Sequence, residues 1–360
     1  MLLDFFVNIN WCCHQNINFK KSANHQKLRL IEEEIIMKKI IKTVFLILLV
    51  GVLFISLAGC GAIGSEKSSG ETNKQKPTIK IGYLPITHAV PLFIEKEQAK
   101  YKNFNLELVK FGSWPELVDA LNTGHIDGAS MLVTLAMKAK AQGIDLKAVA
   151  LGHKDGNVLI TAKDINSVKE LKGKNFAIPH KFSTHNILLY KMLKQNGLKY
   201  EDVHPIELPP AEMPAALSEG RISGYVVAEP FGAVSVAIDK GKVLYQDNQI
   251  WDNSIDCTLV LRGEFIKKEN KIAKKFVGYY IKSGKIAEQK DKQTFEMSSK
   301  YMKVKEDVLD LSFKWITYDN LAINKEDYEE LAKNLIEMGL LENPPSFAEF
   351  VDHSLIKKTK

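Results

Sequence analysis

The sequence lacks a strong surplus of charge and lacks the short motifs of common catalytic sites. Its 49 Lys and Arg side chains stand against 43 Asp and Glu, so the net charge is only +6 over 360 residues. A basic surface of the kind that binds nucleic acid is therefore not expected. Because the chain has no G-x-S-x-G, H-E-x-x-H or Walker loop, we expect neither an enzyme nor a cofactor. With 45% hydrophobic and 26% charged residues, the composition is globular, and the length suits two domains.

Cysteine is also scarce, and one of the four cysteines ends a targeting signal. From Met37 the basic stretch MKKIIK precedes the apolar run TVFLILLVGVLFISLA, Gly59 and Cys60, an order typical of a secretory signal peptide. LAGC at 57–60 resembles the bacterial lipobox, which implies cleavage before Cys60 and acylation of its thiol, for example with palmitate. Several acyl chains give stable anchoring at the outer face of the cell membrane. A plain transmembrane anchor is disfavoured because the apolar run is short.

The signal peptide divides the N-terminal part of the chain. Residues 1–36 precede a complete signal, and we interpret them as upstream sequence translated from a misassigned start. Residues 37–59 form the signal peptide, and residues 60–76 form the lipidated cysteine and a polar linker. Cys12 and Cys13 then fall in the upstream segment, which leaves Cys257 alone in the folded part. An internal disulfide is therefore excluded.

A duplicated pattern organises the rest of the chain. ALNTGHIDG at 120–128 and ALSEGRISG at 216–224 share the form A-L-x-x-G-x-I-x-G. Each copy predicts the end of a helix, a glycine cap in the left-handed conformation (Gly124 and Gly220), and a buried strand. Helices and strands alternate from residue 77 onward, which is typical of a parallel α/β sheet. The sequence therefore predicts two α/β lobes.

The lobe boundaries follow from where the chain is expected to cross. We predict crossings near 161–163 and 261–263, so that residues 77–163 and 262–360 form lobe 1 and residues 164–261 form lobe 2. Ligands of open α/β sheets bind beyond the carboxyl ends of the strands. We therefore expect a cleft between the lobes.

Polar residues follow several predicted strands. YLPITHA (83–89), FGSWPE (111–116) and IPHKFSTHN (178–186) are strand-to-helix junctions, where free backbone N–H groups and the helix dipole favour an anion. These junctions, the end of the second repeat and the lone cysteine supply ten candidate ligand-binding residues: Thr87, His88, Ser113, Trp114, His180, Ser183, Thr184, His185, Glu229 and Cys257.

Several of these candidates have alternative roles that local sequence leaves open. Trp114 is either a flat wall of the site or a lobe-packing residue. His185 is placed to donate to an oxyanion or to close on the solute, whereas His180 is favoured as a structural residue at a strand end. Ser183 and Thr184 serve equally as helix N-caps and as ligand donors.

The combined motifs resemble a known family. KIGYLPITHAVPLFIEKE, FGSWPELVDALNTGHIDGAS, IPHKFSTHN and LPPAEMPAALSEGRISGYVVAEP, together with the lipobox, resemble the substrate-binding lipoproteins of nitrate/sulfonate/bicarbonate (taurine-like) ABC importers over residues 77–350. The resemblance implies a two-lobed type II periplasmic-binding-protein fold, with two three-layer α/β lobes and a double-crossing hinge. It also implies a monomer that delivers a small solute to a membrane permease driven by a separate ATPase. By this resemblance, Trp114 and His185 stand at ligand-contacting positions.

One departure from the resemblance bears on the solute. The nitrate- and bicarbonate-binding relatives place a lysine within the segment matching 251–262, where this chain has Cys257 between Asp256 and Thr258. Losing that cation removes a charge-assisted hydrogen bond worth about 1.5–3 kcal/mol, which disfavours nitrate. Cys257 is favoured as a small cleft or core residue over a reactive thiol.

Other solutes and other roles stay open. We expect a small anionic or sulfonate-like solute. The alternative is a heteroaromatic solute such as a thiamine-precursor pyrimidine or riboflavin, and a pyrimidine-synthase-like enzyme of the same fold is a further alternative. Glu229 is either a cleft residue or an ion-pair partner. His180 and His185 alone do not make a metal site, although a metal chelate is conceivable as the solute.

Overall fold

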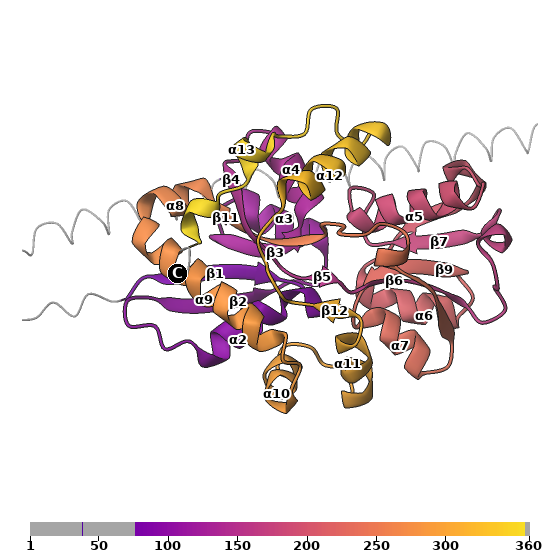
Figure 1. Cartoon of the computed structure of the whole chain (residues 1–360), viewed down its shortest axis with the longest axis horizontal. Coiled ribbons are helices and arrows are strands. Elements are labelled where there is room, and N and C mark those ends of the chain that lie inside the picture. The colour runs from indigo at the N-terminus through magenta and orange to yellow at the C-terminus, as the bar shows by residue number, and fades with distance from the viewer. Residues whose placement is uncertain (1–37, 39–75, 357–360) are drawn as a thin grey trace, which may run out of the picture. The chain divides into compact units, whose positions relative to one another are not determined.

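The computed structural model describes residue 38 and residues 76–356 (Figure 1). The predicted upstream segment, the signal peptide apart from Lys38, the lipidation site Cys60 and residues 61–75 lie outside the described residues. Within the described part, no helix combines the length and the apolar character needed to cross a membrane.

The first sheet has five strands, four of which run parallel to one another. Its order is β2 (Asn105–Lys110), β1 (Thr78–Tyr83), β3 (Gly128–Leu132), β11 (Cys257–Arg262) and β4 (Leu146–Leu151). β11 runs antiparallel to both of its neighbours. Every residue of β3 is buried, as expected of a central strand covered on both faces.

The second sheet repeats this arrangement with a different set of strands. Its order is β8 (His204–Glu207), β7 (Asn175–Ile178), β9 (Gly224–Ala228), β6 (Asn157–Ala162) and β10 (Gly241–Gln246). Here β6 is the antiparallel strand, between β9 and β10. Each strand of one sheet thus has a counterpart in the other. A small third sheet pairs β5 (Lys154–Asp155) with β12 (Ile316–Thr317).

Helices cover the faces of both sheets. Figure 1 shows the first sheet between α3 and α4 on one side and α2 and α9 on the other. The helices are α2 (Val90–Gln98), α3 (Trp114–Asn122), α4 (Val133–Ala141), α5 (Thr184–Gln195), α6 (Met213–Ser218), α7 (Phe231–Ala237), α8 (Gly263–Lys268), α9 (Asn270–Ala287), α10 (Lys292–Ser299), α11 (Glu306–Phe313), α12 (Lys325–Glu337) and α13 (Phe347–Phe350). Short 3-10 turns are η1 (Thr87–Ala89), η2 (Val168–Leu171), η3 (Tyr200–Asp202), η4 (Pro210–Glu212), η5 (Asp247–Gln249) and η6 (His353–Leu355).

The two repeats form equivalent units, as the sequence predicts. Gly124 and Gly220 end α3 and α6 with positive φ angles of 77° and 69°, a conformation that costs glycine little. The last glycine of each repeat, Gly128 or Gly224, is required for a different reason. A Cβ on Gly128 would lie 2.5 Å from the Val260 carbonyl oxygen, and one on Gly224 would lie 2.7 Å from that of Ile160. Both glycines therefore let an antiparallel strand approach.

The crossings between the sheets differ from the expected positions by one strand. The expected boundaries assign β6 to lobe 1 and β11 to lobe 2, whereas the structure places β6 in the second sheet and β11 in the first. The chain therefore crosses within residues 152–156 and 250–256. The apolar runs of β6 and β11 fit either sheet equally well, so only their pairing partners decide where they belong.

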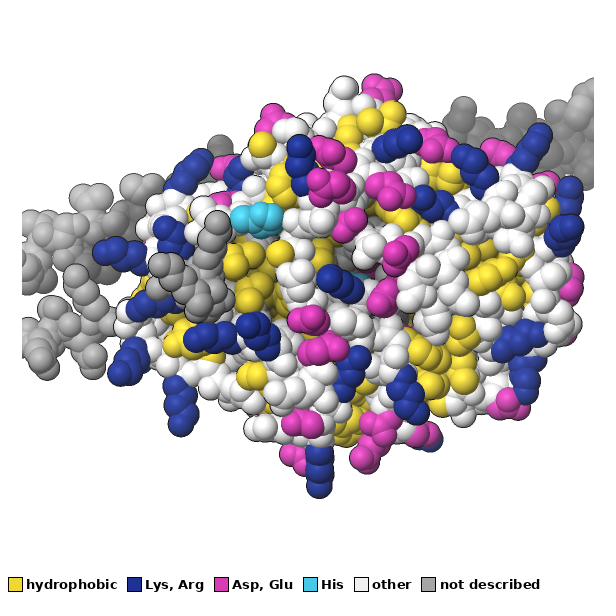
Figure 2. Space-filling model, in the orientation of Figure 1, with side chains coloured by type: hydrophobic (Ala, Val, Ile, Leu, Met, Phe, Trp, Pro, Cys, Tyr) yellow, Lys and Arg dark blue, Asp and Glu magenta, His cyan; other side chains and the backbone are white. Residues whose placement is uncertain are grey.

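The C-terminal helices also contact both lobes rather than lobe 1 alone. α9 packs on α2 of the first lobe, whereas α11 packs on α7 of the second. Tyr190 and Lys194 of α5 both contact the Glu337 carboxylate of α12, at 2.9 and 2.6 Å. On the face shown in Figure 2, basic and acidic side chains are interspersed, in keeping with the balanced composition.

Candidate functional site

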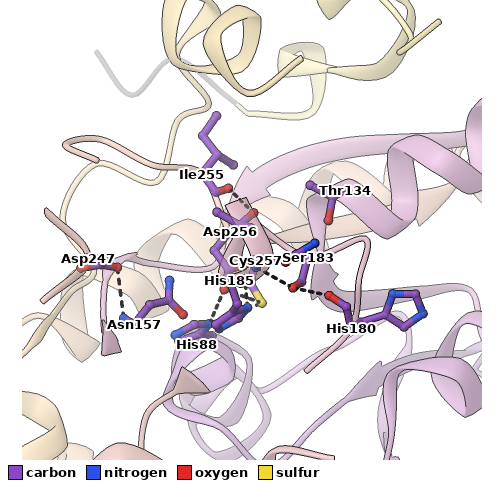
Figure 3. Close-up of polar contacts among 12 residues, drawn as sticks. His88, Thr134, Asn157, His180, Ser183, His185, Asp247, Ile255, Asp256 and Cys257 are labelled. Atoms are coloured by element: carbon purple, nitrogen blue, oxygen red, sulfur yellow. Dashed lines mark hydrogen bonds and ion pairs between the residues drawn. The ribbon is translucent and has the colours of Figure 1, made fainter. Parts of the chain in front are cut away.

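Five buried polar residues meet where the carboxyl ends of the parallel strands in the two sheets face each other. His88 lies in η1 after β1, and His153 follows β4. Asp256 and Cys257 stand at the start of β11, and because that strand is antiparallel, its first residues lie at the same edge. His185 is the second residue of α5, after β7. We call these five residues the histidine cluster; Figure 3 shows His88, His185, Asp256 and Cys257 gathered at its centre.

Backbone carbonyls orient the rings of His88 and His153. His88 Nε2 lies 3.2 Å from the Gly156 carbonyl oxygen, and His153 Nδ1 lies 2.5 Å from that of Asp155. Because a carbonyl oxygen only accepts, the nitrogen facing it is the one that carries the proton in a neutral ring. The other nitrogen of each ring, Nδ1 of His88 and Nε2 of His153, therefore faces the cluster.

Asp256 and Cys257 face those two nitrogens. Asp256 Oδ2 lies 3.1 Å from His88 Nδ1 and 3.9 Å from His153 Nε2. Cys257 Sγ lies 3.4 Å from His88 Nδ1 and 3.7 Å from Asp256 Oδ2. The rings of His88 and His153 stack with their centroids 3.4 Å apart. These contacts bring four donor atoms from three distant parts of the chain into one small volume.

Glycine allows the loop that carries His153 to pack closely. A Cβ on Gly152 would lie 2.7 Å from the His88 carbonyl oxygen, so the end of β4 reaches η1 only without a side chain there. The Gly152 N–H also donates to the Cys257 carbonyl oxygen at 2.8 Å. This bond fixes the position of His153 beside β11.

Burial controls the protonation of the cluster. Burial lowers the pKa of His153 well below its ordinary value and lowers the pKa of His185 to about 4. Burial raises the pKa of the Cys257 thiol, and the nearby Asp256 raises it further. For Asp256, burial acts upward, but the neighbouring His185 and His88 outweigh it and hold the pKa below its usual range. A carboxylate therefore faces neutral His153 and His185 rings and a thiol.

His185 joins the cluster from the second lobe. Its Nδ1 lies 3.6 Å from Asp256 Oδ1, yet neither ring nitrogen has a hydrogen-bond partner in the described part of the chain. The neighbouring Thr184 hydroxyl donates to the Ile255 carbonyl oxygen at 2.9 Å, which ties the start of α5 to the crossing segment before Asp256.

Thr87 and Glu229 join the lobes next to the cluster. The Thr87 N–H and hydroxyl both donate to the Glu229 carbonyl oxygen, at 2.8 and 3.0 Å. The Glu229 side chain turns the other way: its Oε2 lies 3.0 Å from the Ala233 N–H and 2.9 Å from the Ser312 hydroxyl. Burial raises the pKa of Glu229 to about 8.

The remaining predicted residues stand at the strand-to-helix junctions before α3 and α5. Trp114 is buried, and its Nε1 has no hydrogen-bond partner in the described residues. Ser113 precedes it as the N-cap of α3 but makes no side-chain cap bond. Ser183 caps α5, because its hydroxyl oxygen accepts from the Asn186 N–H. The His180 ring points away from the cluster (Figure 3) and lies 3.8 Å from the Glu207 carboxylate.

Four residues in or beside the cluster are missed by the sequence analysis, among them Asp256, which it names only as a neighbour of Cys257. His153 follows a predicted strand, so the carboxyl-end rule could have found it. Thr134 lies within an apolar run that continues from β3 into α4, so its sequence context gave no signal. Its hydroxyl donates across the lobes to the Phe182 carbonyl oxygen at 2.5 Å. Asn157 begins β6, and its position depends on that strand being antiparallel. Both polar side-chain atoms of Asn157 lack partners among the described residues.

The described fold and site define a class of protein. Two lobes of equal topology, joined by crossing segments and meeting over a buried polar cluster, form a periplasmic-binding-protein fold of the two-lobed type II class. The profile of the NMT1-like family matches residues 72–299. The chain belongs to this family.

Individual relatives agree with this assignment. The ligand-binding component of an ABC-type import system from Staphylococcus aureus, crystallised with zinc bound, is 43% identical, with a TM-score of 0.76 over 79% of this chain and 99% of that one. The periplasmic nitrate-binding protein NrtA from Synechocystis shares the fold at 20% identity, with a TM-score of 0.69 over 78% and 87% of the two chains.

A third relative is a longer protein that matches only part of this chain. The nitrate import ATP-binding protein NrtC from Synechocystis is 26% identical over 58% of this chain, and the match spans 35% of the relative. The chain thus corresponds to about a third of that longer protein, whose name describes an ATP-binding component.

Proposed function

We propose that this chain is the extracytoplasmic solute-binding protein of an ABC importer, held at the outer face of the cell membrane by a lipidated Cys60. It captures a small solute between its lobes, presents it to a permease driven by a separate ATPase, and catalyses no reaction. The fold supports this proposal, and so do relatives that are named as ligand-binding or nitrate-binding proteins.

One observation carries the proposal. Among the described residues, several buried polar atoms at the strand-to-helix junctions and beside the crossing segments have no hydrogen-bond partner. They belong to Trp114, Asn157, His185 and Asp256. A buried polar group without a partner costs about 1–3 kcal/mol, so such groups are expected where a ligand supplies the missing partners.

The contacts between the lobes describe a closed form. The Thr87–Glu229 bonds and the Thr134–Phe182 bond link opposite sides of the cleft. The crossing segments at 152–156 and 250–256 provide the hinge. An open form admits the solute to one lobe, closure brings His185 over it, and the closed form docks on the permease.

A thermal-shift screen of the purified full chain in mild detergent tests the proposal. The panel contains nitrate, bicarbonate, taurine, alkanesulfonates, hydroxymethylpyrimidines, riboflavin and, because the Staphylococcus relative was crystallised with zinc, divalent metal salts. A true solute at a hundred times its dissociation constant adds about 2.7 kcal/mol of stability. If no member raises the melting temperature and deletion of the gene leaves uptake of every member unchanged in the native host, the proposal is wrong.

Trp114→Phe tests the site assignment. The variant keeps an aromatic ring but loses the unpartnered indole N–H. If this group donates to the solute, the variant binds about tenfold more weakly, which corresponds to the loss of one hydrogen bond. His204→Phe, at an exposed position on β8, is the control and should bind as the parent protein does. Unchanged affinity in Trp114→Phe would remove Trp114 from the site.

A further inference from the structure

The donor atoms of the histidine cluster suit a metal ion. His88, His153, Asp256 and Cys257 each offer one ligand atom, and these atoms all lie within 4.8 Å of one another. All four side chains are buried. Two imidazole nitrogens, one sulfur and one carboxylate oxygen form a donor set that favours zinc and related transition metals over magnesium or calcium.

The distances between the donors are close to those around a tetrahedral ion. With bonds of about 2.0–2.3 Å to N, O and S, the edges of a zinc tetrahedron measure about 3.4–3.6 Å. The observed separations are 3.1 Å for His88 Nδ1 to Asp256 Oδ2, 3.4 Å for His88 Nδ1 to Cys257 Sγ and 3.7 Å for Cys257 Sγ to Asp256 Oδ2. His153 Nε2 lies 3.9 Å from the same carboxylate oxygen. Since all four ligand atoms lie within 4.8 Å of one another, the His153 ring would have to move inward to complete the polyhedron.

The outer bonds of the histidines are those of metal ligands. Each ring donates its far N–H to a backbone carbonyl, Gly156 for His88 and Asp155 for His153. Metal-bound histidines commonly make this bond, which fixes the tautomer and directs the free lone pair at the metal. The Cys257 N–H pointing at His153 Nε2 from 3.4 Å agrees with an unprotonated nitrogen there.

The charges of the cluster call for a cation. Two ring nitrogens, a thiol and a carboxylate converge at buried positions, and a bound cation would balance the buried charge of the carboxylate. An anionic solute would meet the Asp256 carboxylate and worsen this balance. A divalent metal ion with one carboxylate, one thiolate and two neutral imidazoles gives a net charge of zero. On binding, the Cys257 thiol releases its proton to water while the lobes are open.

We infer that the cleft of this protein binds a divalent transition-metal ion of the zinc type, held by His88, His153, Asp256 and Cys257 and covered by His185 on closure. This inference rests on the proposed solute-binding function and names the class of its solute. His185 Nδ1 lies 3.6 Å from Asp256 Oδ1, and neither atom has a hydrogen-bond partner within the described part of the chain, so the second lobe would contact the metal site there.

Metal titrations of the chelator-stripped full chain in mild detergent test the inference. Zinc chloride should bind with a stoichiometry of one, and Mg²⁺ and Ca²⁺ at equal concentration should not compete. Cobalt chloride should give a near-ultraviolet cobalt–thiolate absorption that Cys257→Ser lacks. Asp256→Asn and His153→Gln should weaken zinc binding by more than about 100-fold, since changes at outer-shell partners already cost about 10- to 100-fold.

The controls separate a metal site from a structural network. His204→Gln, at an exposed histidine, should keep parental affinity, and melting curves without metal should show that each variant folds. If a proton rather than a metal holds the cluster together, the parent protein binds neither ion, and the inference is overturned. Zinc bound equally well by the Cys257→Ser and Asp256→Asn variants would place the ion elsewhere and overturn it too.

The same data distinguish this inference from the proposed function. A nitrate, sulfonate or heteroaromatic solute that raises the melting temperature equally with and without chelator would leave solute binding intact and refute the metal. If zinc binds at this site but deletion of the gene leaves uptake of the metals and of every other panel member unchanged, the metal site is supported and the transport role is refuted.

Discussion

Replacing Glu229 with glutamine should change how stability depends on pH. Ser312 Oγ lies 2.9 Å from Glu229 Oε2 and 2.8 Å from the Val308 carbonyl oxygen. One hydroxyl proton serves only one of these acceptors. A protonated Glu229 that donates to Ser312, while Ser312 donates to Val308, satisfies both contacts. This arrangement agrees with the pKa of Glu229, which burial raises to about 8.

The sign of the effect follows from proton linkage. Between about pH 4.5, the ordinary pKa of a glutamic acid, and about pH 8, the folded state holds this proton and the unfolded state does not. Stability from this group is therefore fully present below about pH 4.5 and is lost progressively as the pH rises to about 8. At about 1.36 kcal/mol per pH unit, the whole effect has a ceiling of about 5 kcal/mol.

Urea unfolding of the parent protein and of Glu229→Gln at pH 5 and pH 9 measures this effect. The amide cannot reproduce both contacts of Oε2, so the variant should be less stable at pH 5 by about 1 kcal/mol, typical of one hydrogen bond. At pH 9 the order should reverse, because the variant has no carboxylate to bury. The exposed Glu212→Gln is the control. An equal stability difference at both pH values would refute a neutral buried Glu229.

Two further predictions concern packing and closure. Gly128→Ala and Gly224→Ala should each destabilise the fold by about 1–3 kcal/mol through overpacking, because the new methyl group would meet a carbonyl oxygen at 2.5 or 2.7 Å. Gly278→Ala in α9, where a Cβ meets nothing within 4 Å, should instead stabilise it by about 0.5–1 kcal/mol; urea unfolding measures all three, and equal effects would contradict the steric argument. Thr134→Val removes a bond between the lobes and should release solute about fivefold to tenfold faster in stopped-flow measurements, matching about 1 kcal/mol. Unchanged release would mean that this bond does not hold the lobes closed.

The sequence by itself determined the two repeated units. Local chemistry was sufficient there: the glycine caps at Gly124 and Gly220 and the buried runs that follow them need no distant partner to be recognised. It also located several strand-to-helix junctions, because the ends of strands and the first turns of helices leave local signals. His88 and His185 were identified as candidates for this reason, and Cys257 because it is the lone cysteine of the folded part.

The tertiary structure alone decided how these residues meet. His88 and Cys257 are 169 positions apart, and they touch because β11 returns antiparallel into the first sheet. No local pattern reveals that insertion, since a buried apolar strand fits either sheet. The orientation of the His88 ring likewise depends on the Gly156 carbonyl oxygen, 68 positions away in the sequence. Three of the five cluster residues, His88, His185 and Cys257, were therefore identified in advance, whereas the convergence of all five on one point depended on the pairing of strands distant in sequence.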